Sequence, residues 1–140
     1  MTTTEKLITW GPGLLTGIPS IDEQHRVLVD MCNESHELLL SQASTESTKR
    51  IVRDLMSYAL YHFETEEELA VSCGYDADQA EQNAAHRAQH RAFASAVAEM
   101  QLEMSRGNAI SVDALFEFLR SWLTQHIQGT DMELARYISR

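Results

Sequence analysis

The chain has 140 residues, of which 44% are hydrophobic and only six are glycine and two proline, a composition that suits one mostly helical domain with its own core. Eleven lysines and arginines against 21 aspartates and glutamates give a net charge of −10, which argues against nucleic acid and an anionic membrane surface as partners. No apolar run approaches the roughly 20 residues that cross a bilayer, and the N-terminus lacks a secretory signal, so we expect no membrane insertion and a cytoplasmic protein.

The N-terminal segment, residues 1–19, shows no helical period, and we expect it to form an ordered loop arm over the rest of the domain with Trp10 as its anchor. The sequence SIDE at 20–23 matches a capping box and predicts the start of a first helix, over about residues 20–40. The side chains expected to point inward from this helix are Ile21, His25, Leu28, Cys32 and Leu39, with Met31 and Leu38 beside them.

Two further helices are predicted from residues repeating at intervals of three and four. One covers about residues 46–73 and stops at Gly74, and its inward positions are Ile51, Leu55, Tyr58, His62, Glu66, Leu69 and Cys73. The next covers about 77–106, and its inward positions are His86, His90, Phe93, Val97, Met100 or Gln101, and Met104.

The last predicted helix covers about residues 111–138, beginning at Ser111, with Leu115, Leu119, Trp122 and His126 on its inner face. Four amphipathic segments with short connections predict an all-α fold, an antiparallel up-down-up-down four-helix bundle with an N-terminal loop arm. We expect a single domain over residues 1–140.

Polar side chains on the apolar faces are the most informative feature of the sequence. A single histidine there is more often a hydrogen-bonded core residue than a ligand, the His86/His90 spacing arises by chance as well as in metal sites, and Glu66 could simply pair with His62 four residues earlier. Together, however, every helix contributes at least one such residue, and uncompensated burial of each costs several kcal/mol. Imidazoles and carboxylates that converge in a bundle core predict a metal site.

The number of these side chains exceeds what one six-coordinate ion uses, so two ions bridged by carboxylates account for them better. A set of imidazoles and carboxylates without thiolate suits iron, manganese or zinc. Because the glutamate-rich ExxH pairs of ferritin-like sites are absent, a histidine-rich di-iron centre is the preferred interpretation.

The stretch HIQGTD, 126–131, contains a histidine and an aspartate that are five residues apart. A regular helix would turn Asp131 roughly 140° away from the face of His126. The apolar positions shift by one residue at the same place, because Asp131, Leu134 and Ile138 begin a new three-four pattern. One inserted residue predicts a π-bulge within 127–131 that returns Asp131 to the core, with Gly129 easing the distortion.

The motifs GIPSIDEQH (17–25), HFETE (62–66), HRAQH (86–90) and HIQGTD (126–131), with WLTQHI at 122–127, resemble those of the hemerythrins, particularly the single-domain bacteriohemerythrins. The resemblance extends from Trp10 to about Ile138. It implies two non-heme iron ions in an oxo- or hydroxo-bridged centre that binds O2 reversibly. It also implies that His86, His90 and His126 hold one iron, that His25 and His62 hold the other with one position open for O2, and that Glu66 and Asp131 bridge the two.

Helix geometry suggests an apolar O2 pocket formed by residues close in sequence to the candidate ligands: Leu28, Phe63, Trp122, Leu123 and Ile127. Such a wall would exclude water and slow oxidation of the iron, although ordinary core packing accounts for the same residues. No general acid, base or substrate-binding residue is evident beside the metals, so we do not expect an enzyme.

The function that the resemblance implies is O2 carriage, storage or delivery. The alternatives are an O2 or redox sensing module, or an iron-handling, nitric-oxide-binding or oxidase protein that uses the same centre. The expected partners are O2 and an unidentified O2-consuming recipient, with the chain a monomer or weak homo-oligomer. Outside the site, we expect a structural or surface role for His36, core positions too far apart for a disulfide for Cys32 and Cys73, and a solvated surface for Glu64, Glu67 and Glu68.

Overall fold

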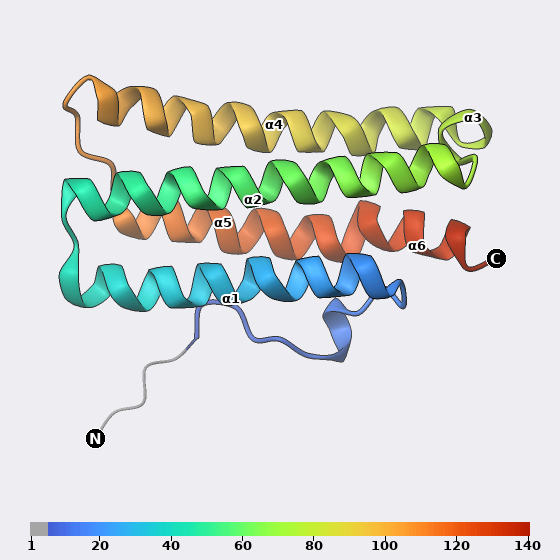
Figure 1. The fold of residues 1–140 in the computed structure, drawn as a ribbon, viewed down its shortest axis with the longest axis horizontal. Coiled ribbons are helices and arrows are strands. Elements are labelled where there is room, and N and C mark those ends of the chain that lie inside the picture. Colours follow the sequence, from blue (N-terminus) through green and yellow to red (C-terminus); the bar gives the residue numbers. More distant parts are fainter. Residues whose placement is uncertain (1–5) are drawn as a thin grey trace.

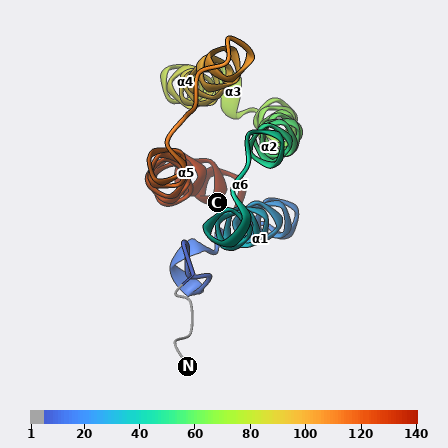
Figure 2. The ribbon, with the colours of Figure 1, turned by 90° about the vertical axis from the view of Figure 1, so that its left-hand side faces the viewer.

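A computed structural model, which describes residues 6–140, shows four long helical rods packed side by side, and the rods run alternately up and down (Figure 1). Viewed end-on, they occupy the corners of a bundle in which α1 neighbours α2 and α5, and α2 neighbours α4 (Figure 2). The elements are η1 (Pro12–Leu14), α1 (Pro19–Gln42), α2 (Thr45–Ser72), α3 (Tyr75–Asp78), α4 (Ala80–Ser105), α5 (Val112–His126), η2 (Ile127–Asp131) and α6 (Met132–Ile138). The predicted antiparallel four-helix bundle is confirmed.

The start of α1 differs from the expected capping box. The helix begins at Pro19, whose fixed φ suits the first helical position, and the Ser20 side chain caps nothing. Instead, the Asp22 carboxylate reaches back and accepts hydrogen bonds from the Thr16 backbone and hydroxyl, both at 2.7 Å, and from the Gly17 N–H at 3.1 Å. The capping-box prediction was therefore wrong, and Asp22 ties the arm to the helix.

The turns between helices carry their own local stabilisation. Ser44 and Ser47 form a reciprocal capping box at the start of α2, and the Ser111 hydroxyl accepts from the Ala114 N–H at the start of α5. Gly74 has a φ of +84°, a left-handed conformation that ends α2 where the sequence indicated. The third rod is interrupted, because the short helix α3 ends at Asp78 and Gln79 separates it from the start of α4.

The arm lies along the bundle, and its buried anchors are Ile8 and Leu14. Asn33 on α1 pairs with both backbone groups of Ile8, accepting from the N–H at 2.8 Å and donating to the carbonyl at 2.9 Å. Trp10, the expected anchor, is only half-buried, and the Arg26 guanidinium lies 5.4 Å from its ring centre. The first five residues of the expected arm lie outside the described part of the chain.

Two apolar clusters fill the bundle. The larger one contains Leu28, Phe63 and Phe93, and the smaller one, at the end of the bundle near α3 and α6, contains Ile21, Ala70, Tyr75 and Leu134. The inward positions predicted on α1 are buried, except that Leu38 is 44% exposed and Met31 is half-buried. Within residues 6–140, no helix combines the length and the apolar character needed to cross a membrane.

Candidate metal centre

The fourth rod changes its winding at the point where the sequence suggested a distortion. Ile127–Asp131 form a π-helical turn between α5 and α6, which confirms the predicted bulge. Its effect is to place two consecutive residues against the two nitrogens of one imidazole: the Thr130 hydroxyl lies 3.0 Å from His126 Nδ1, and Asp131 Oδ1 lies 3.0 Å from His126 Nε2. With this winding, the residues four and five positions after His126 each contact one of its two ring nitrogens.

The suggested role of Gly129 in this distortion is not supported. Its φ is not positive, and a Cβ added to it would meet no atom within 4 Å. The π turn consequently does not depend on a glycine at this position.

The seven side chains singled out as candidate ligands come together in the bundle interior. Each is at most 4% exposed: His25, His62, Glu66, His86, His90, His126 and Asp131. The Asp131 carboxylate lies 2.8 Å from His25 Nε2 and 2.9 Å from His86 Nε2. The Glu66 carboxylate lies 3.1 Å from His90 Nε2 and 3.4 Å from His62 Nε2.

These side chains form two overlapping groups, and within each group one ligand atom per residue lies within 4.8 Å of the others. One group contains Glu66, His86, His90, His126 and Asp131. The other contains His25, His62, Glu66 and Asp131. Both carboxylates are thus common to a three-histidine group and a two-histidine group.

The buried polar atoms of this cluster fit a metal centre. The Nε2 atoms of three histidines and three of the four carboxylate oxygens are close to one another but lack hydrogen-bonding geometry: His25, His62 and His86, with Glu66 Oε2 and both oxygens of Asp131. Buried groups left in this condition cost several kcal/mol each unless something else coordinates them. Imidazole nitrogens and carboxylate oxygens directed at common points are a ligand set that suits iron, manganese or zinc.

The outer nitrogens of three of these histidines are held by residues that the sequence analysis did not identify. His62 Nδ1 donates to Gln24 Oε1 at 2.8 Å, and His126 Nδ1 donates to Gln89 Oε1 at 2.7 Å. Because an amide oxygen only accepts, the proton resides on Nδ1 and the Nε2 lone pair faces the cluster. Partners of this kind fix both the orientation and the tautomer of a ligating imidazole.

The third such residue is Glu67, and it corrects an expectation. We expected Glu64, Glu67 and Glu68 to form a solvated surface, but Glu67 is only 34% exposed, and its Oε2 accepts from His90 Nδ1 at 3.0 Å. Its place next to Glu66 was visible in the sequence, but its contact with α4 depends on how the two helices pack.

Burial and nearby charges shift the pKa values of the clustered histidines in opposite directions in the metal-free protein. Burial alone would lower the pKa of His25 and His86, but their contacts with Asp131 and Glu66 raise both pKa values to about 9. For His62, burial prevails over the attraction of Glu66 and lowers the pKa to about 4. Burial also opposes protonation of His126, but Asp131 and Glu66 raise its pKa as well. Without metal, positive imidazoles therefore compensate the two buried carboxylates.

We expect metal binding to release protons from these two histidines. His25 and His86 hold protons below about pH 9, so a metal ion must displace them, and affinity should rise with pH and level off above that value. At about pH 7.5, binding of Zn²⁺ as a probe should release protons, about two of them from His25 and His86. Calorimetry in buffers of different ionisation enthalpy measures this number, and binding without proton release would contradict the assignment.

Aromatic side chains cover one side of the cluster. The Phe63 ring stacks on His90, with centroids 4.1 Å apart and planes at 10°, and the Trp122 ring stacks on His126 at 4.5 Å and 16°. Phe63 also lies 5.9 Å from the His62 ring, so it touches both histidine groups. Leu28, Leu123 and Ile127, the remaining residues of the expected pocket, are each at most 3% exposed.

A four-helix bundle with a buried cluster of histidines and carboxylates in two linked groups is an arrangement found in metal-binding bundle proteins. The family model described as the hemerythrin HHE cation binding domain matches residues 16–138. The chain belongs to the hemerythrin family.

Individual relatives agree with this assignment. A bacteriohemerythrin of Stenotrophomonas maltophilia is 35% identical over 131 residues, 92% of this chain and 80% of the relative. A bacteriohemerythrin of Methylococcus capsulatus is 31% identical over 126 residues, 89% of this chain and 92% of the relative. A crystal structure of wild-type hemerythrin superposes with a TM-score of 0.84 at 28% identity and covers 96% of this chain and 99% of that one.

Proposed function

We propose that this protein binds O2 reversibly at a non-heme, carboxylate-bridged di-iron centre and serves in oxygen carriage, storage or delivery. The observation that carries the proposal is the pair of histidine groups of unequal size that share both Glu66 and Asp131. Unequal groups with common carboxylates suit two metal ions of which one keeps a position for an exogenous ligand, as centres that bind small ligands do. The bacteriohemerythrins among the relatives support iron as the metal.

In this proposal, His86, His90 and His126 hold one iron, His25 and His62 hold the other, and Glu66 and Asp131 bridge them. A pair of ferrous ions supplies the two electrons that reversible O2 binding requires. The protein orients the imidazoles through Gln24 and the other partners of Nδ1.

The apolar residues Leu28, Phe63, Trp122, Leu123 and Ile127 belong to the same proposal, as the wall of an O2 pocket. Four of them are buried and Trp122 is half-buried, and in this proposal their apolar side chains exclude water and slow irreversible oxidation of the iron. We also propose that the chain acts as a binding protein and not as an enzyme. The free cysteines, Cys32 and Cys73, are compatible with a reducing compartment, and we propose a cytoplasmic location.

The sensing, iron-handling, nitric-oxide-binding and oxidase alternatives use the same residues, so reversibility separates them from a carrier. The test is metal analysis combined with absorption spectra of the iron-loaded protein cycled between air and argon. We expect about two irons per chain, as two ligand groups require, and an oxygenated spectrum that disappears under argon and returns in air. Loss of that spectrum within seconds in air with release of peroxide would favour an oxidase, and zinc without colour would refute the di-iron assignment.

A further inference from the structure

The histidines of the candidate centre differ in what holds their outer nitrogen. The partners of His62 and His126 are the neutral amide oxygens of Gln24 and Gln89, whereas the partner of His90 is the carboxylate of Glu67. A carboxylate that accepts from a ligating imidazole raises the basicity of that ligand, and a neutral amide does so less. This difference therefore gives the three-histidine group one imidazole, that of His90, that is a stronger electron-pair donor to a bound metal ion.

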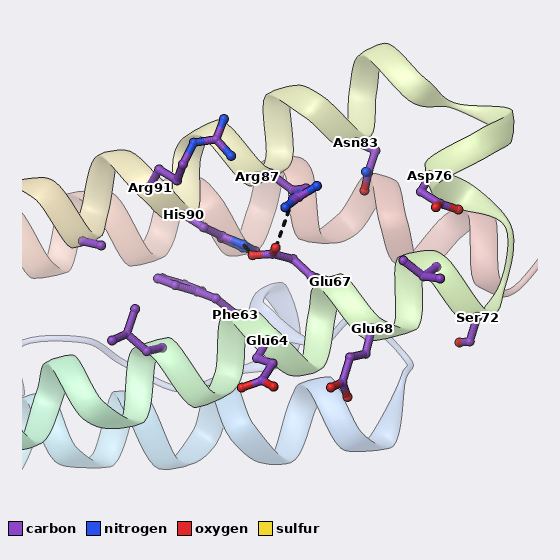
Figure 3. Close-up of a pocket in the computed structure, with 13 residues that line it drawn as sticks. Phe63, Glu64, Glu67, Glu68, Ser72, Asp76, Asn83, Arg87, His90 and Arg91 are labelled. Carbon is purple, nitrogen blue, oxygen red and sulfur yellow. Dashed lines mark hydrogen bonds and ion pairs between the residues drawn. The ribbon is translucent and has the colours of Figure 1, made fainter.

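Glu67 is held in place from both sides. Its Oε2 accepts from His90 Nδ1 at 3.0 Å, and its Oε1 accepts from Arg87 Nε at 3.1 Å (Figure 3). Arg87 lies three residues before His90 on α4 and so emerges on the same face of that helix. Arg87, Glu67 and His90 thus form a continuous hydrogen-bonded chain between α2 and α4.

Glu67 also lies at the boundary between the buried cluster and water. It lines an open groove of about 850 Å³ between α2 and α4, together with His90, Phe63 and Arg87 (Figure 3). Of the seven candidate ligands, His90 alone lines this groove. At this position the carboxylate contacts both water and the Arg87 guanidinium.

From these contacts we infer that Glu67 is a positioning residue that orients His90 as a ligand and raises its donor strength, with Arg87 holding the carboxylate in place. This inference rests on the proposed di-iron function. A more basic imidazole stabilises the higher oxidation state of the ion it binds. Glu67 therefore lowers the reduction potential of the iron held by the three-histidine group and slows the loss of that iron.

Four variants test the inference. Glu67→Gln keeps an acceptor for His90 and removes the charge, and Glu67→Leu removes both. Arg87→Met removes the cation that holds Glu67. Glu64→Gln is the matched control. Glu64 lines the same groove one turn earlier on α2, but it is exposed and contacts none of the candidate ligands.

Three measurements apply to each variant: the rate of iron transfer to a chelator, the midpoint potentials of the iron-loaded protein, and the thermal unfolding of the metal-free protein. Glu67→Leu should lose iron about 10- to 100-fold faster than wild type, the range found when a residue that orients a ligand is removed. Glu67→Gln should retain iron better than Glu67→Leu and still shift one potential to a more positive value. Arg87→Met should have a smaller effect than Glu67→Leu, because Arg87 is 54% exposed and exposed ion pairs are weak.

A merely structural role for Glu67 would change unfolding of the metal-free protein and leave the potential of Glu67→Gln at the wild-type value. That unshifted potential, or iron loss from Glu67→Leu at the rate of Glu64→Gln, would overturn the inference. Failure of the proposed function is distinguishable, because it would appear in the wild-type protein as a lack of two irons or of a reversible oxygenated spectrum.

Discussion

Replacing His62 with alanine is expected to abolish reversible O2 binding. The two-histidine group would keep one imidazole, from His25, together with the shared carboxylates Glu66 and Asp131. Loss of a direct ligand should exceed the roughly 10- to 100-fold loss of affinity that follows when only a residue orienting a ligand is removed. Iron analysis should therefore fall toward about one iron per chain, the number expected for the remaining complete ligand group, and spectra cycled between air and argon should show no oxygenated form.

The matched control is His36→Ala, which removes the one histidine outside the cluster. His36 packs on Phe116, with ring centroids 5.0 Å apart, and belongs to neither ligand group. This variant should retain both irons and the oxygenated spectrum. Reversible oxygenation that persists in His62→Ala would mean that the assignment of the open position to the group of His25 and His62 is wrong.

The sequence was sufficient for the fold and for the identity of the clustered residues, because both follow from helical periodicity. A side chain that recurs every three or four residues shares a face with its apolar neighbours. His62 and Glu66 therefore had to face inward with Leu55, and His86 and His90 with Phe93, whatever the details of the bundle. The same periodicity detected the shift between His126 and Asp131.

Contacts between helices were not predictable in this way. Gln24 is adjacent to His25 in the chain but holds His62 on another helix, and Gln89 is adjacent to His90 but holds His126. Each glutamine is rotated about 100° from its neighbouring ligand, so it reaches a histidine of the next helix in the bundle. Which one it reaches depends on the rotation and height of each helix, and a single sequence contains no measure of either.

The start of α1 shows a second limit. The residues Ser20 and Glu23 have the spacing of a capping box, but Pro19 can itself occupy the first helical position, and Asp22 already serves the loop before it. The capping box and the proline start are two local patterns that involve the same few residues. The structure adopts the proline start, in which Asp22 contacts Thr16 of the arm, and the helical pattern does not include this contact.

Deleting Gly129 is expected to weaken the metal centre while leaving the bundle folded. Without this residue the π turn becomes a regular helix, and Asp131 moves to four residues after His126. Residues four apart share a face of a regular helix, so the carboxylate would still point inward, but its position along the helix relative to His126 Nε2 would change. Because Asp131 is shared by both ligand groups, both irons should be held less tightly, and the rate of iron transfer to a chelator after anaerobic reconstitution measures this.

The substitution Gly129→Ala separates the residue count from the residue type. A Cβ at this position meets nothing within 4 Å, so the variant should keep both irons, and alanine should raise helix stability by about 0.5–1 kcal/mol. The deletion should also unfold cooperatively without metal, because Leu134 and Ile138 would then fall seven and eleven residues after His126, on the regular inward face. Iron transfer from the deletion variant at the wild-type rate would show that Asp131 does not need the π turn. Faster transfer from a folded deletion variant, with the wild-type rate in Gly129→Ala, would show that the inserted residue serves the ligand position and not the packing of the bundle.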